Sequence, residues 1–83
     1  VNPWPSAYTF YKGKMLKIWD ANVVEASDSY KPGQIFKVTK DAIYVKALDE
    51  GLEIVQLQLE GKKRMNTKEF LCGVRVAEGE IFG

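Results

Sequence analysis

The sequence contains 83 residues, enough for one small domain. Apolar residues make up 46% and charged residues 28%, a balance typical of folded proteins and not of disordered ones. There is no histidine and only one cysteine, which excludes an internal disulfide, histidine-dependent catalytic triads and most zinc sites. No apolar run reaches the roughly 18–20 residues of a membrane span, so we expect a cytoplasmic protein with no membrane partner.

The net charge is only +1, but the charges are unevenly distributed along the chain. Residues 1–19 and 61–68 contain basic side chains and no acidic ones, whereas the rest of the chain holds five basic and eleven acidic side chains. The basic residues of these two segments are Lys12, Lys14, Lys17, Lys62, Lys63, Arg64 and Lys68. Because charges act over about 8–10 Å in physiological salt, the domain presents a basic face if folding brings the two segments together.

Residues 1–6 are predicted to form an extended lead-in. Pro3 and Pro5 flank Trp4, and each proline disfavours helix at the residue before it. An aromatic residue in such a segment usually packs against another element. We therefore expect Trp4, Pro3 and Pro5 to make interdomain contacts, and we interpret the chain as a piece excised from a longer protein.

From Ala7 onward the pattern is that of β-strands separated by short turns. In residues 15–24, Leu16 and Ile18 share one face, and Lys17 and Trp19 share the other, although strand aromatics usually belong to the core and we expect this of Trp19. The hydrophobic phase slips near residues 54–55, which predicts a bulge or bend there. The expected strands are residues 8–11, 15–24, 34–39, 42–48 and 52–60.

One short helix is predicted, at residues 67–72. Asn66 and Glu69 have the spacing of a capping box, and Gly73 provides the stop. We expect Cys72 to be a buried, inert thiol. Residues 74–76 then form a brief last strand, and Ile81 and Phe82 dock the tail. The strand number, the length and the late helix predict a single domain with an all-β fold, a small OB-like Greek-key β-barrel of five to six strands.

The sequence gives almost no sign of catalysis or of metal binding. Its glycines never form a phosphate-binding GxGxxG or Walker loop, and its carboxylates are scattered. Binding signals are stronger, because lysines interleave with the aromatic residues of the first hairpin and Lys62–Arg64 follows a strand directly. Cationic and aromatic side chains on a barrel face suit a nucleic-acid backbone. The alternative is an ordinary solvated surface over a core of aromatic residues.

Four motifs together resemble one family, the C-terminal domain of methionyl-tRNA formyltransferase. The resemblance covers nearly the whole chain, in order, and departs from the family pattern only at Ser6, where glycine is usual, and at Cys72. The motifs are Asn2–Thr9, Lys14–Trp19, Lys31–Ile35, and Leu57–Met65 followed by Glu69–Gly73.

The resemblance implies a binding module and not the enzyme itself. In this family a separate N-terminal domain binds 10-formyltetrahydrofolate and carries the catalytic residues, histidine among them, so we expect no catalytic residue and no cofactor in this chain. The C-terminal barrel helps to hold initiator methionyl-tRNA, for translation initiation in protein biosynthesis, through contacts that are largely independent of sequence. Lys62, Lys63 and Arg64 match the family motif, and the other basic residues are assigned to tRNA from composition. A monomer is expected.

Two relatives share this barrel without a tRNA substrate: sugar formyltransferases, and the hydrolase region of 10-formyltetrahydrofolate dehydrogenase. The alternative interpretation is therefore a structural barrel that docks on its catalytic domain and has no RNA role. The two interpretations differ in salt response, because phosphate contacts release counterions and apolar docking does not.

Overall fold

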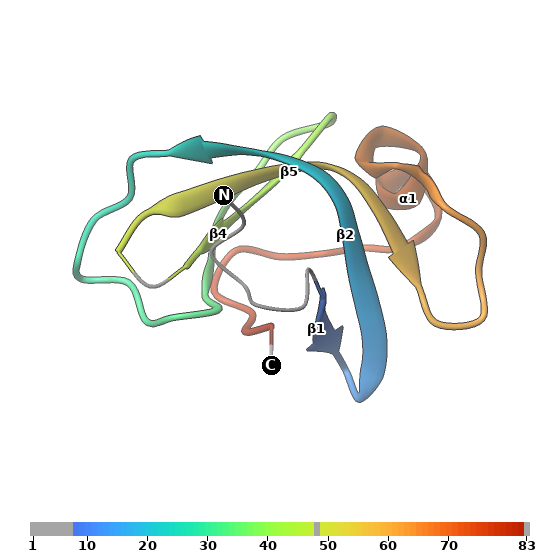
Figure 1. Ribbon diagram of the computed structural model, residues 1–83, viewed down its shortest axis with the longest axis horizontal. Coiled ribbons are helices and arrows are strands. Elements are labelled where there is room, and N and C mark those ends of the chain that lie inside the picture. The colour runs from blue at the N-terminus through green and yellow to red at the C-terminus, as the bar shows by residue number, and fades with distance from the viewer. Residues whose placement is uncertain (1–7, 48, 83) are drawn as a thin grey trace.

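The computed structural model describes residues 8–47 and 49–82, and the predictions for Pro3, Trp4, Pro5 and Leu48 lie outside this part of the chain. The described residues form a six-stranded antiparallel sheet and one short helix (Figure 1). The strands are β1 (Tyr8–Tyr11), β2 (Lys14–Val24), β3 (Ile35–Val38), β4 (Ile43–Lys46), β5 (Gly51–Leu59) and β6 (Met65–Asn66), and the helix is α1 (Thr67–Gly73). The prediction of a small barrel of five to six strands with a late helix is confirmed.

The sheet has the order β1-β2-β5-β4-β3, with β6 paired to β5 at one end. The two longest strands, β2 and β5, pair along most of their length and curve together, so that the sheet curls into a half-barrel (Figure 1). Strands β3, β4 and β5 follow one another as a meander. Strand β2 pairs directly with β5, although β3 and β4 lie between them in the sequence. This pairing brings the first hairpin and the segment after β5 to the same part of the molecule.

The predicted irregularity in β5 is present. Ile18 pairs with Leu57, Asp20 with Gln56 and Ala21 with Ile54, so Val55 in β5 has no partner in this register. A matching irregularity lies in β2, where Trp19 is the unpaired residue. An extra residue bends a strand and increases its twist, which explains how the two long strands coil without losing their core faces.

The core fills the concave side of the half-barrel. Alternating residues of β2 and β5 are buried there, together with residues of β3 and β4, and Phe70 of α1 packs against them. The Thr67 side chain is fully buried, and its hydroxyl donates a 2.8 Å hydrogen bond to the Ile54 carbonyl, which fixes the start of the helix against β5. The largest fully buried side chains are Leu16, Ile35, Ile43, Ile54, Leu57, Val45 and Thr67.

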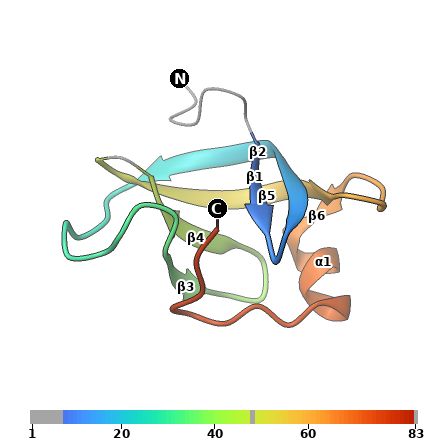
Figure 2. The same ribbon diagram turned by 90° about the horizontal axis from the view of Figure 1, so that it is seen from below.

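The chain after α1 returns along the open side of the half-barrel (Figure 2). Its backbone pairs with the start of β3, where the Ile35 N–H donates to Glu80 and the Phe82 N–H donates to Gly33. Phe82 is buried in the core, but Ile81 is 49% exposed, so only one of the two expected docking residues docks. The prediction of a strand at residues 74–76 is wrong, because the tail takes its backbone partners at residues 79–82 instead; of the predicted strand, Val76 still contributes a buried side chain.

The predicted capping box is also wrong. Asn66 makes no side-chain bond to the helix, because it belongs to β6 and its side chain points across to β5, where its Oδ1 accepts a hydrogen bond from Gln56 Nε2 at 3.3 Å. Cys72 is exposed on α1, contrary to the expectation of a buried thiol. The short helix buries Thr67 and Phe70, and this leaves Cys72 on its outer side.

Candidate nucleic-acid interface

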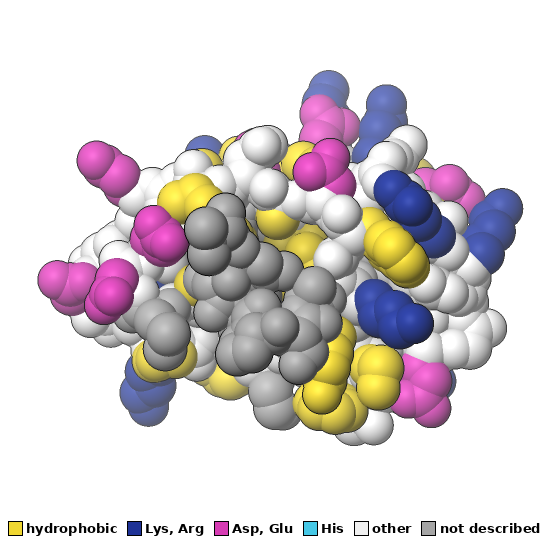
Figure 3. Space-filling view, in the orientation of Figure 1, with side chains coloured by type: hydrophobic (Ala, Val, Ile, Leu, Met, Phe, Trp, Pro, Cys, Tyr) yellow, Lys and Arg dark blue, Asp and Glu magenta, His cyan; other side chains and the backbone are white. Residues whose placement is uncertain are grey.

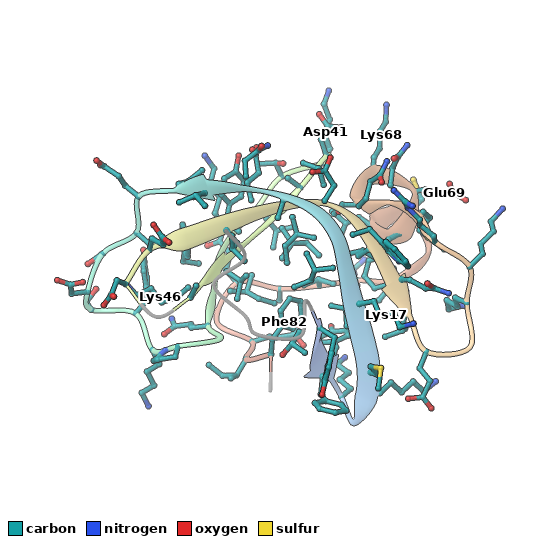
Figure 4. All side chains as sticks on the ribbon, viewed as in Figure 1. Lys17, Asp41, Lys46, Lys68, Glu69 and Phe82 are labelled. Atoms are coloured by element: carbon teal, nitrogen blue, oxygen red, sulfur yellow. The ribbon has the colours of Figure 1, made fainter. Side chains whose placement is uncertain are left out.

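The outer face of β2 and β5 is polar and cationic. Leu16 and Ile18 are buried, and the residues that alternate with them, Lys17 and Trp19, are exposed. Lys17 lies opposite Tyr8 of β1 on one side and Gln58 of β5 on the other, so its ammonium stands in the middle of this face (Figure 4). Trp19 is 46% exposed, so the expectation that it belongs to the core is wrong.

Gln58 connects β2 to the basic segment that follows β5. Its Oε1 accepts a 3.1 Å hydrogen bond from the indole Nε1 of Trp19, and its Nε2 donates a 2.9 Å bond to the Lys62 carbonyl. The loop backbone is tied further by the Lys62 N–H, which donates to Leu59. The loop that carries Lys62 and Lys63 is therefore attached to the outer face of the sheet.

Arg64 lies flat against this face. Its Nη2 and Nε donate to Gln56 Oε1 at 2.7 and 3.3 Å, and its Cζ stands 4.7 Å from the centroid of the Trp19 ring. The stacking is a cation–π contact, to which arginine is well suited by its planar guanidinium. Arg64, from the second basic segment, is thus held by Trp19 of β2 and by Gln56 of β5.

The structure brings Lys17 from the first basic segment together with residues 62–64 from the second. Figure 3 shows Lys and Arg side chains gathered on this part of the molecule, with hydrophobic side chains among them. Lys14 lies at the near end of the hairpin, because the next residue, Met15, exchanges hydrogen bonds with Glu60 at the start of the basic loop. We call Lys17, Lys62, Lys63 and Arg64 the basic face.

Two of the predicted residues lie apart from the basic face. The Lys12 ammonium is 3.8 Å from a Glu80 carboxylate oxygen and 5.3 Å from the centre of the Tyr11 ring, so it faces the C-terminal tail. Lys68 is exposed in the first turn of α1, where Figure 4 shows it pointing away from Lys17. The structure therefore gathers part of the expected set.

Figure 3 shows some acidic side chains at the edges of the part where the basic side chains gather, and others at the opposite end of the molecule. Glu25, Asp49 and Glu50 border a hollow there, beside the end of β2. On the basic side, Glu60 is the carboxylate nearest in sequence, and it is engaged with the Met15 N–H. Among residues 8–47 and 49–82 the ion pairs are Lys12–Glu80 and Lys46–Asp28, so no carboxylate of this part of the chain forms an ion pair with the basic face.

A shallow pocket of about 280 Å³ opens beside Lys17, with Met15 and the residues 58–61 as its other walls.

Sequence reasoning did not identify Gln56 and Gln58, which organise this region. Their signal was available in the pattern, because they alternate with the buried Leu57 and Leu59 and so must share the outer face with Lys17 and Trp19.

In the ranges that the structure covers, no three His, Cys, Asp or Glu side chains come together as metal ligands would. None of the helices in those ranges is long and apolar enough to cross a membrane.

Comparisons with known proteins agree on one family. Residues 1–75 match the family described as "Formyl transferase, C-terminal domain". A "Methionyl-tRNA formyltransferase" of Agathobacter rectalis is 49% identical over 99% of this chain, and proteins of the same name from Caldanaerobacter subterraneus subsp. tengcongensis and Acetivibrio thermocellus are 46% and 40% identical over 98% and 99% of it. The chain spans about a quarter of the length of these relatives, 26–27%. The resemblance found in the sequence motifs is confirmed, and the chain belongs to the formyl transferase C-terminal domain family.

Proposed function

We propose that this chain holds initiator methionyl-tRNA for a methionyl-tRNA formyltransferase. In this proposal the basic face binds and orients the tRNA through contacts to its sugar–phosphate backbone. A separate catalytic domain of the same polypeptide binds 10-formyltetrahydrofolate and transfers its formyl group to the methionine amino group. The names of the relatives and the short span of their length that this chain covers support such a division of labour.

The observation that carries the proposal is the basic face itself. Lys17 and the Lys62–Arg64 loop lie on one surface, and Gln58, which also bonds to Trp19, attaches the loop to it. No carboxylate of the described residues forms an ion pair with these basic side chains. Lysine and arginine side chains on such a surface displace condensed counterions from a nucleic acid, and this release is the main source of affinity that does not depend on base sequence. The chemistry of the proposed domain is therefore positioning: it brings the aminoacyl end within reach of a catalytic site elsewhere.

The test is removal of charge from the loop. The triple change Lys62→Ala, Lys63→Ala and Arg64→Ala in the intact protein should weaken binding of initiator methionyl-tRNA by roughly 1–3 kcal/mol and make the log–log salt slope shallower by about 2.7, since each phosphate contact contributes about 0.9. A matched control removes three exposed lysines outside the basic face, Lys31, Lys37 and Lys40. The control variant should bind tRNA as the parent does. If the loop variant binds tRNA as the parent does, or if the two variants weaken binding equally, while circular dichroism shows both folded, the proposal fails.

A second candidate function is docking without RNA contact. Tyr8 and Phe10 on the outer face of β1 are 38% and 42% exposed and contact each other edge to face at 5.9 Å between ring centroids, as apolar docking residues would. This candidate predicts tRNA binding that is unaffected by the loop substitutions, and loss of activity in a Phe10→Ala variant through loosened packing between domains. We propose a cytoplasmic monomer in either case, and the mass of the native protein, almost four times that of this chain by the length of its relatives, is the simplest check of the larger polypeptide.

A further inference from the structure

We propose that Arg64, Gln56 and Trp19 form one preassembled phosphodiester-binding site. In this site Arg64 contacts the phosphate, and Gln56 and Trp19 hold the Arg64 guanidinium in position. This inference rests on the proposed tRNA-holding function. It deepens that function by naming the point at which the RNA backbone is gripped, and it assigns roles to Gln56 and Trp19, which carry no charge.

The geometry of Arg64 leaves the correct edge for an anion. A guanidinium has five N–H donors in a fixed plane. Gln56 Oε1 takes the donors of one side, Nε at 3.3 Å and one N–H of Nη2 at 2.7 Å, while the Trp19 ring covers one face of the plane. Within the described ranges, no hydrogen bond occupies the terminal edge, which is formed by Nη1 and the second N–H of Nη2. That edge binds phosphate oxygens in a bidentate manner.

The partners that hold Arg64 are neutral. Gln56 donates from its Nε2 to Asn66 Oδ1 at 3.3 Å, which turns its carbonyl toward Arg64. Trp19 is in turn fixed by the bond from its indole N–H to Gln58. A carboxylate in the place of Gln56 would hold the guanidinium equally well but would cancel its charge. Amide and indole partners orient the arginine and leave its full positive charge for an external anion.

The neighbouring lysines lack this support. Lys62 and Lys63 are exposed, and within the described part of the chain their ammonium groups have no carboxylate within ion-pair distance. Each must lose the freedom of a long side chain when it binds a phosphate, whereas Arg64 is already ordered. We therefore assign Arg64 the largest share of the affinity of the loop, and the lysines the role of point charges.

The experiment is a double-mutant cycle in the intact protein with initiator methionyl-tRNA, measured across a salt series. Gln56→Ala should lower affinity by about twofold to tenfold with an unchanged salt slope, because it removes the ordering of Arg64 and no charge. Arg64→Lys should lower affinity by about tenfold with an unchanged slope, because the charge stays and the bidentate contact is lost. Arg64→Ala should lower affinity and also make the slope shallower by about 0.9.

The decisive comparison is Gln56→Ala in the Arg64→Ala background, where it should have no further effect, because a positioning residue acts only through the residue it positions. Arg75→Lys, at the other arginine of the chain, is the matched control and should bind as the parent does. Trp19→Phe keeps a ring under the guanidinium and should preserve more affinity than Trp19→Ala. Thermal unfolding of each variant separates lost binding from lost folding.

Each outcome decides a different statement. If Arg64→Lys binds like the parent, or if Gln56→Ala weakens binding equally in both backgrounds, the preassembled site is refuted while the basic face can still bind RNA. If the Lys62, Lys63 and Arg64 triple variant also binds unchanged, the proposed function itself fails. Should Gln56→Ala unfold the domain, the Arg64→Lys comparison with Arg75→Lys still decides the proposal.

Discussion

The contact between Tyr11 and the C-terminal tail gives a quantitative test of how the half-barrel is closed. Tyr11 is 4% exposed, and its hydroxyl donates to the Glu80 carboxylate at 3.1 Å, while its ring meets Phe82 edge to face at 5.4 Å between centroids. The change Tyr11→Phe keeps the ring and removes the hydroxyl. A hydrogen bond to a charged acceptor contributes about 1.5–3 kcal/mol, and this one is only partly buried, so we expect a loss of about 1–2 kcal/mol at neutral pH.

The same bond makes the loss depend on pH. Burial, then the hydrogen bond to Glu80 and the negative charge of Glu80, raise the pKa of Tyr11 from 10.0 to about 12. Because the pKa of the folded state lies above that of the unfolded state, the neutral phenol stabilises the fold fully below about pH 10, and this contribution disappears as the pH rises to about 12. A shift of this size corresponds to about 2.7 kcal/mol.

The assay is urea unfolding of the parent and of the Tyr11→Phe variant along an alkaline pH series. The difference between the two free energies of unfolding cancels the titration of lysines and of other tyrosines, which both proteins share. We expect that difference to be constant below about pH 9, to shrink as the pH rises, and to pass through zero before about pH 12. A difference that stays constant through this range, or a variant as stable as the parent at neutral pH, would refute the reasoning.

Two further predictions concern stability. Gly33→Ala should lower the free energy of unfolding by about 2 kcal/mol or more, because Gly33 has φ +84° and an added Cβ would collide with the Phe82 carbonyl oxygen. Gly13→Ala, at φ +82° in open space, should cost only the backbone strain of about 1 kcal/mol. Equal costs of the two changes in urea unfolding would contradict this. Lys46→Met should raise the free energy of unfolding by about 1 kcal/mol. The Lys46 side chain is 3% exposed, and among the described residues its ammonium has no hydrogen-bond partner, only the exposed Asp28 carboxylate at 3.6 Å. A lower melting temperature would show that this ion pair stabilises the fold.

Strands β1, β2 and β5 were predictable from sequence because alternate residues along much of each strand are buried, whereas the two-residue strand β6 was not predicted. The alternation of Leu16 and Ile18 with Lys17 and Trp19 placed the faces of β2 correctly, and the phase slip near Val55 located the irregularity in β5. Where the prediction failed, a general preference had overridden the pattern: Trp19 was assigned to the core because aromatic residues are usually buried, although its own alternation put it outside.

The errors at the C-terminal end have a different origin. Asn66 has the residue type and spacing of a helix cap, but its side chain pairs with Gln56 on the neighbouring strand. The tail likewise takes its partners from Gly33 and Ile35, far away in the chain. Local patterns describe local hydrogen bonds, and they cannot show that a distant strand offers a competing partner.

The candidate site was predictable only as two separate basic segments. Lys17 and residues 62–64 share a surface because β2 pairs with β5. No residue in either basic segment indicates this pairing. Gln56 and Gln58 were missed because uncharged amides carry no signal in a charge count. The salt bridge that turns Lys12 toward Glu80 depends on the path of the tail and was equally invisible.

The salt dependence of tRNA binding to the intact, unsubstituted protein tests the central claim most directly. Four residues form the basic face, and Lys14 lies beside it at the end of the hairpin, which gives about four to five phosphate contacts. The logarithm of the binding constant for initiator methionyl-tRNA should then fall linearly with the logarithm of salt concentration, with a slope of about −3 to −5. A slope near zero would mean that these side chains do not contact the RNA backbone. It would favour the alternative, a barrel that docks on its catalytic domain and does not bind RNA.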